Sequence, residues 1–423
     1  MRSRRSYLPP VELRGPLVAG AALTVATWAF VSFTPIFSNW LFGDARFYEN
    51  WGNWMTNHQV PYRDFNVEYP PGALPTFAVP VYLKLIFGHY NTWYFWFRIE
   101  LLVFALLMLA AMGWALAELR VSRRHAYAAL CIAGVTPALL GPTTLFHYDY
   151  WPAMFGVAAV AALVARRGVL ACTFAALGAV AKVYPAVIIP IALIELWRHG
   201  RWRSLGAGVG AALAVALVTV GPFAVMAPHG VWWAIHREAS RHLETETLGA
   251  SLIGAAHELA GVHIHVIARD ASHSLAGAWP DAVASASTFL TLAALIGVYL
   301  LYLRSRRTPE DQVVACAAAV TAYVVFSKVF SPQYLLWLVP LVPLVGGRRG
   351  LRASALLLVI LAVTQIFEPY RWRQYSHVST PWLDWVVVGR NVLVVALLVV
   401  LAEPLVRGVR ARQTDTVPVL QTE

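Results

Sequence analysis

Long apolar runs recur along this chain and constrain its fold more than any other feature. Runs at 99–118, 205–227, 282–303 and 384–402 each approach the roughly 20 apolar residues that a helix needs to cross about 30 Å of hydrocarbon. Only 13% of the residues are charged, whereas a soluble protein carries roughly 25%. The 17 tryptophans and 17 tyrosines often lie at the ends of the runs, as membrane interfaces favour. The sequence therefore predicts an all-α polytopic membrane protein.

Basic clusters separate the apolar runs and predict the topology. They hold most of the 33 lysines and arginines, and by the positive-inside rule they mark cytoplasmic turns. The net charge of +11 is then a topology signal, and nucleic acid is not expected as a partner. We predict about 12 crossings of the plasma (inner) membrane, with both termini in the cytoplasm. The clusters are 2–14, 120–124, 166–167, 198–203, 304–307, 348–352 and 407–412. The predicted spans are 16–37, 93–118, 126–142, 151–165, 168–181, 183–197, 204–228, 282–303, 311–328, 332–346, 351–367 and 384–402.

One transmembrane domain is predicted over 1–407, followed by a cytoplasmic tail, 408–423, without stable structure. The first apolar run is longer than the core of a signal peptide and lacks an A-x-A exit, so an uncleaved first span is expected. Residues 73–88 are apolar but contain prolines and a lysine, and a crossing there would invert every later cluster. This segment is predicted to re-enter the membrane or lie on its outer face. The larger outer stretches are 38–92, 229–281 and 368–383.

The cysteines and histidines do not predict a metal site. Cys131, Cys172 and Cys316 lie in apolar runs, at no metal-ligand spacing, and suggest no disulfide framework. Seven of the 13 histidines fall in 229–281, but His263 and His265 are not spaced like a zinc-binding pair. We therefore expect solvated histidines, no metal and no cofactor.

The first outer stretch contains a candidate catalytic carboxylate. The pattern over 45–57 predicts an amphipathic helix in the outer interface, with Asp44 at its start and Tyr48 in its first turn. Asp44 is then either the N-cap of the helix or a general base held at the membrane surface. Both roles are compatible only if one carboxylate oxygen remains free.

Polar groups follow in the tight turns of the outer face. Glu68 and Tyr69 precede tandem prolines, which fix a rigid turn that is either structural or presents these two side chains. His147 and Asp149 lie in a short outer turn, where helix capping is the expected role of Asp149.

Several basic residues lie on the side that the positive-inside rule disfavours. Lys182, next to Tyr184, either extends its amine to the outer headgroups or binds a phosphate at the membrane surface. Lys328, Arg371 and Arg373 are similar candidates.

The outer-face motifs, in this order, resemble the polyprenyl-phosphate-sugar-dependent glycosyltransferases of the GT-C superfamily. The similarity is greatest to glycosyltransferase family 87, whose best-known members are actinobacterial α-mannosyltransferases that build phosphatidylinositol mannosides and lipoarabinomannan. Residues 247–252 only loosely resemble a helix in the large outer loop of that family. The motifs are Gly43-Asp44, Pro61-Tyr62, Glu68-Tyr69-Pro70-Pro71, Lys182-Val183-Tyr184-Pro185 and Ser331-Pro332-Gln333-Tyr334.

This resemblance implies a GT-C-type fold and sugar transfer, most simply of mannose, from a polyprenyl-phosphate donor to a glycolipid or glycan acceptor. It implies Asp44 as the catalytic base. Donor phosphate binding is expected at Lys182 first, then at Lys328, Arg371 and Arg373. Another sugar, such as arabinofuranose or glucose, is the alternative within this class, and a multi-span transporter is the alternative outside it. The expected substrate-binding residues are Tyr48, Glu68, Tyr69, His147, Asp149, Tyr184, Gln333 and Tyr334.

Overall fold

A computed structural model describes residues 12–34, 44–88, 92–198, 202–269, 272–368, 371 and 380–414. Nearly all of this chain is helical, as the apolar runs predict. The elements in chain order are α1 Arg14–Phe33, α2 Ala45–Thr56, η2 Pro71–Ala73, α3 Leu74–Phe87, α4 Trp93–Leu119, α5 Arg123–Leu140, α6 Thr143–Phe146, α7 Tyr150–Val164, α8 Gly168–Ala179, η3 Tyr184–Ile188, α9 Ile189–Arg198, α10 Trp202–Met226, α11 Pro228–Ala239, β1 Leu243–Glu244, α12 Leu248–Ala260, β2 Val266–Arg269, β3 Ser272–Leu275, α13 Ala278–Arg304, α14 Pro309–Phe326, η4 Pro332–Trp337, η5 Val342–Leu344, α15 Gly347–Phe367 and α17 Pro381–Thr414.

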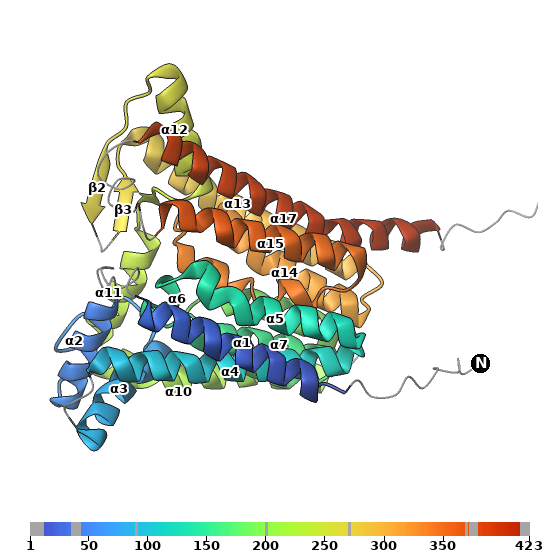
Figure 1. The fold of residues 1–423 in the computed structure, drawn as a ribbon, viewed down its shortest axis with the longest axis horizontal. Coiled ribbons are helices and arrows are strands. Elements are labelled where there is room, and N and C mark those ends of the chain that lie inside the picture. Colours follow the sequence, from blue (N-terminus) through green and yellow to red (C-terminus); the bar gives the residue numbers. More distant parts are fainter. Residues whose placement is uncertain are drawn as a thin grey trace, which may run out of the picture.

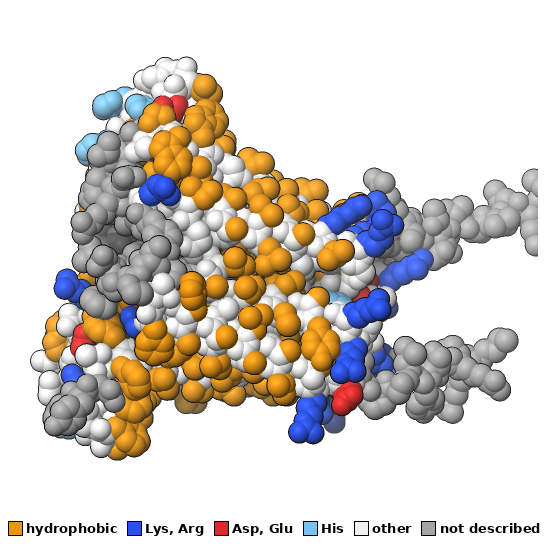
Figure 2. All heavy atoms as spheres, viewed as in Figure 1, with side chains coloured by type: hydrophobic (Ala, Val, Ile, Leu, Met, Phe, Trp, Pro, Cys, Tyr) orange, Lys and Arg blue, Asp and Glu red, His pale blue; other side chains and the backbone are white. Residues whose placement is uncertain are grey.

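The long helices run side by side between two ends of the molecule (Figure 1). One end carries the start of α1 and the end of α17, and we call it the basic end because lysine and arginine side chains gather there (Figure 2). The opposite end carries α2, α11, α12 and the strands, and we call it the loop end. Apolar side chains cover the face between the two ends (Figure 2), as expected of a surface that meets lipid.

Six of the described helices are long and apolar enough to cross a membrane, namely α1, α4, α10, α13, α15 and α17. The other segments predicted to cross are also helical but shorter or less apolar. At 1.5 Å per residue, for example, the 15 residues of α7 extend about 22 Å, less than the roughly 30 Å of hydrocarbon. The helical membrane class is therefore supported, and the count of about 12 crossings stays a prediction.

Two helices rich in small residues form the centre of the bundle. In α7 and α14 most side chains are buried, chiefly alanine and valine, so neighbouring helices surround both. α14 begins with a capping box, in which Thr308 and Asp311 satisfy each other's backbone N–H groups.

The loop end contains a small antiparallel sheet with strand order β1-β3-β2. The all-α prediction is wrong for this part of the outer stretch 229–281. Strands of two to four residues are too short to show a two-residue alternation in the sequence. Here Leu243 pairs with Leu275, and both side chains pack into a small apolar cluster.

The predicted amphipathic helix at 45–57 is confirmed as α2, which buries Tyr48, Trp51 and Gly52 on one side. Gly52 lies against α3 so closely that a Cβ atom would meet the Phe77 carbonyl oxygen at 2.1 Å. α3, within the segment 73–88, extends about 21 Å and lies at the loop end with α2 (Figure 1). At the other end, α17 continues to Thr414, so the first residues of the predicted tail are helical.

Candidate active site at the loop end

Asp44 lies at the N-terminus of α2, but its side chain does not cap the helix. Its Oδ2 atom instead accepts hydrogen bonds from the hydroxyls of Tyr69 (3.2 Å) and Tyr48 (3.4 Å). The capping interpretation is therefore wrong. Among the residues that the structure describes, no hydrogen bond reaches Oδ1, and the side chain is 23% exposed. One carboxylate oxygen is thus held in place while the other can accept a proton.

A cluster of aromatic rings fixes the two hydroxyls. Tyr48 stacks on Phe77 of α3 with ring centroids 4.6 Å apart, and Tyr148 meets Tyr48 and Tyr69 edge-on at 5.6 and 5.1 Å. Burial raises the pKa of all three tyrosines well above the ordinary value, so they remain neutral hydrogen-bond donors.

His147 approaches the same carboxylate from the turn between α6 and α7. Its Nε2 lies 3.8 Å from Asp44 Oδ2, and its Nδ1 lies 3.0 Å from the Thr143 carbonyl oxygen. Because a carbonyl only accepts, Nδ1 carries a proton, and Nε2 faces Asp44 with a lone pair when the ring is neutral.

Asp149 and Lys182 form an ion pair beside the tyrosine cluster. Lys182 Nζ and the Trp337 indole N–H both donate to Asp149 Oδ1, at 2.7 and 2.6 Å. The side chains of Asp149 and Lys182 are 1% and 12% exposed. The predictions of a helix-capping Asp149 and of a lysine extending to the headgroups are therefore wrong. Asp149 Oδ2 is buried without a hydrogen-bond partner among the described residues.

Aromatic rings surround the Lys182 ammonium. Tyr334, Tyr148, Trp337 and Tyr69 have ring centroids 5.1 to 5.9 Å from Nζ, within the range of cation–π attraction. Trp337 is stacked between Tyr334 at 3.9 Å and Tyr184 at 4.1 Å. Gln333 lies half-buried beside them in η4.

Backbone contacts bring the motif segments together. The Gly72 N–H donates to the Val180 carbonyl, and the Trp151 indole donates to the Gly72 carbonyl. A Cβ atom at residue 72 would lie 2.6 Å from the Val180 oxygen, so only glycine allows this approach. The turn at 68–72, the start of α7 and the end of α8 consequently pack as one unit.

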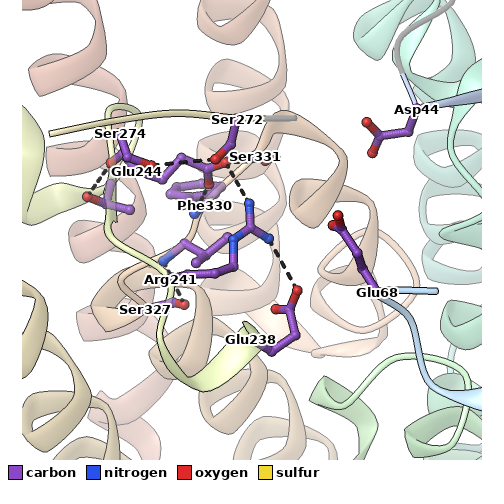
Figure 3. A network of polar contacts seen from close by, with 12 residues as sticks. Asp44, Glu68, Glu238, Arg241, Glu244, Ser272, Ser274, Ser327, Phe330 and Ser331 are labelled. Atoms are coloured by element: carbon purple, nitrogen blue, oxygen red, sulfur yellow. Dashed lines mark hydrogen bonds and ion pairs between the residues drawn. The ribbon is translucent and has the colours of Figure 1, made fainter. Parts of the chain in front are cut away.

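A second group of charges comes from α11 and the residues after it. Arg237 binds Glu68 at 2.7 Å, while Arg241 lies 3.6 Å from both Glu238 and Glu244. Figure 3 shows Asp44 and Glu68 on one side and Arg241 with its two glutamates on the other. Burial alone would lower the pKa of Arg241, but the two glutamates raise it above its ordinary value.

The remaining predicted cations lie differently. Lys328 Nζ donates to the Ala239 carbonyl at 2.6 Å, at the end of α11. Arg371 is exposed, and its side chain contacts the Ile366 carbonyl and the Trp382 ring. Arg373 lies outside the described residues.

Three residues of this site, Arg237, Arg241 and Trp337, were not predicted from the sequence. The two arginines satisfy the criterion that singled out Lys182, because they are basic residues in a stretch predicted to be outside. Their spacing of four residues at the end of an amphipathic helix was the available signal. Trp337 had no local signal, because tryptophan is common throughout the chain.

Comparison with known proteins assigns no family. No protein-family model matches the chain, and no curated protein matches it. The resemblance to glycosyltransferase family 87 remains a prediction from the motifs.

Proposed function

We propose that the protein is a membrane glycosyltransferase that moves a sugar, mannose first among the candidates, from a polyprenyl-phosphate donor to a glycolipid or glycan acceptor. The main support is the Asp44 carboxylate at the loop end. It does not cap α2 and instead accepts hydrogen bonds from two tyrosine hydroxyls. A carboxylate fixed through one oxygen, with the other open to a substrate, has the arrangement that a general base requires.

The proposed reaction is a single displacement with inversion. Asp44 Oδ1 takes the proton from the acceptor hydroxyl as that oxygen attacks the anomeric carbon. The bond from the anomeric carbon to the phosphate oxygen breaks, and polyprenyl phosphate leaves with one more negative charge than it had in the donor. Only one carboxylate is needed, in contrast to the paired carboxylates of glycoside hydrolases.

The membrane arrangement belongs to the same proposal. A GT-C-type fold with about 12 crossings would place the loop end outside and the basic end in the cytoplasm. The apolar face in Figure 2 would then let a polyprenyl tail stay in the bilayer while its phosphate reaches the loop end. Of the four rings around Lys182, those of Tyr69 and Tyr334 are partly exposed and are available to stack against a sugar face.

The test is sugar transfer by membranes that contain the protein, given radiolabelled polyprenyl-phosphate-mannose and a glycolipid extract. We expect transfer by the wild type and its loss in Asp44→Asn. Asp281→Asn is the matched control, because Asp281 is an exposed carboxylate of the loop end that pairs only with His242 among the described residues. Transfer that survives Asp44→Asn would reject this base. No transfer of mannose, arabinofuranose or glucose, together with solute movement into vesicles, would favour a transporter.

A further inference from the structure

Lys182, the first candidate for binding the donor phosphate, is already neutralised. Its ammonium is 2.7 Å from Asp149, and both side chains are almost excluded from water. Moving Lys182 toward a phosphate would leave the Asp149 carboxylate buried without its cation, which is strongly unfavourable. Lys182 is therefore placed to hold the aromatic rings together rather than to bind an incoming anion.

Arg241 is held by longer contacts than Lys182. Its two carboxylate contacts are 3.6 Å long, whereas charge-assisted hydrogen bonds from nitrogen measure about 2.7–2.9 Å. Glu244 is also held by other groups, because it accepts hydrogen bonds from the Phe330 backbone N–H at 2.7 Å and from the Ser331 hydroxyl at 3.2 Å. Glu238 is 47% exposed and can turn toward water.

Arg241 also faces the part of the loop end that contains Asp44. The Arg241 guanidinium lies near the hydroxyls of Tyr69 and Tyr334, and the Tyr69 hydroxyl lies 3.2 Å from Asp44 Oδ2. Figure 3 shows Arg241 between its glutamates on one side and the Asp44 and Glu68 carboxylates opposite. An anion bound to Arg241 would thus lie on the same side of the tyrosine cluster as the proposed base.

We infer that Arg241 binds the phosphate of the polyprenyl lipid and that Glu238 covers this cation until the lipid displaces it. The inference rests on the proposed function for the choice of lipid. The planar guanidinium can contact two phosphate oxygens at once. During transfer the phosphodiester of the donor becomes a phosphate monoester, so Arg241 faces the oxygen on which charge develops. The monoester product should therefore bind more tightly than a lipid phosphodiester.

The experiment measures binding of decaprenyl phosphate to purified protein in nanodiscs, without any sugar. We expect Arg241→Gln to weaken binding by about tenfold or more, and Glu238→Gln to strengthen it severalfold because the competing carboxylate is removed. Arg63→Gln is the matched control, since Arg63 is an exposed arginine of the loop end paired with Asp64. Unchanged binding in Arg241→Gln, or no gain in Glu238→Gln, overturns the inference; the second result does so even if Arg241→Gln fails to fold.

Two competitors identify the ligand chemistry. Inorganic phosphate that competes as well as the lipid, or phosphatidylglycerol that binds as well, overturns a site for a lipid phosphate monoester.

The lipid-binding inference and the proposed glycosyl transfer can fail separately. Arg241-dependent binding without transfer of any polyprenyl-phosphate sugar would retain the lipid site and reject glycosyl transfer. Normal transfer by Arg241→Gln would retain glycosyl transfer and reject Arg241 as the phosphate ligand.

Discussion

The Lys182 ammonium lies 2.7 Å from the Asp149 carboxylate, in an ion pair that water hardly reaches. Lys182→Met should lower the free energy of unfolding by about 3–5 kcal/mol, because a buried carboxylate is left without its cation. Asp149→Asn in the same chain should recover most of this loss, since the amide oxygen still accepts from Trp337. Thermal unfolding in detergent measures both variants. If the double variant is no more stable than Lys182→Met, the unpaired Asp149 carboxylate is not the cause of the stability lost in Lys182→Met.

Tyr69→Phe tests whether the Tyr69 hydroxyl positions Asp44, the proposed base. The substitution removes one hydroxyl donor to Asp44 but keeps the ring beside Lys182. Hydrogen bonds to charged groups contribute about 1.5–3 kcal/mol, so we expect sugar transfer to fall by about tenfold or more with normal expression. Tyr82→Phe, on an exposed side chain of α3, is the control. A wild-type rate in Tyr69→Phe would show that this hydroxyl does not position Asp44.

Gly72→Ala tests whether the motif segments must pack together. The new Cβ atom would meet the Val180 carbonyl oxygen at 2.6 Å, so the turn at 68–72 must move away from α8. We expect a lower melting temperature and loss of transfer. Gly206→Ala is the control, because no atom lies within 4 Å of a Cβ built there, in α10. It should be neutral or raise stability by up to about 1 kcal/mol. Equal behaviour of the two variants would contradict the proposed packing.

The sequence predicts many residues of the site, but it does not predict which of these side chains contact one another. The order and spacing of the motifs predict that Asp44, Tyr69, Lys182 and Tyr334 belong to one face, and the structure brings them together. Local rules failed for Asp149, where position before a helix favours a cap. Its real partner is 33 residues away, and pairwise contacts over such distances leave no trace in local pattern.

The fold shows the same division. Apolar runs and the 3.6-residue period predict α2, α4, α10 and α13 closely. The strands were missed because they are stabilised by pairing across the outer stretch rather than by their own sequence.

Glu368, which follows α15, should make stability depend on pH. Burial raises its pKa from 4.5 to about 8. Its charged neighbour Glu246 lies 3.8 Å from Arg390, and burial also raises the pKa of Glu246. The unfolded chain loses the Glu368 proton near pH 4.5, while the folded chain keeps it until about pH 8. Stability should therefore fall as pH rises from about 5 to about 8. Melting temperatures across this range should show a smaller slope in Glu368→Gln, and an unchanged slope would exclude Glu368 as its source.

The sidedness can be tested by labelling introduced cysteines. Asn57→Cys is exposed at the loop end and Arg167→Cys at the basic end, whereas the native cysteines are buried or partly buried. We expect a membrane-impermeant maleimide to label Asn57→Cys in intact cells and Arg167→Cys only after permeabilisation. The wild-type chain gives the background. The reverse pattern would place the loop end in the cytoplasm and exclude transfer on the outer face.

Asp149 acquires its two hydrogen-bond donors at different times during synthesis. Lys182 follows it by 33 residues and Trp337 by 188. A nascent chain inserted as far as α9 can form the ion pair, yet its carboxylate lacks the indole until most of the chain has left the ribosome. Truncated or stalled chains would thus expose an incompletely bonded acceptor inside the bundle. Asp149 Oδ1 therefore has both of its donors only after the segment around Trp337 has packed into the bundle.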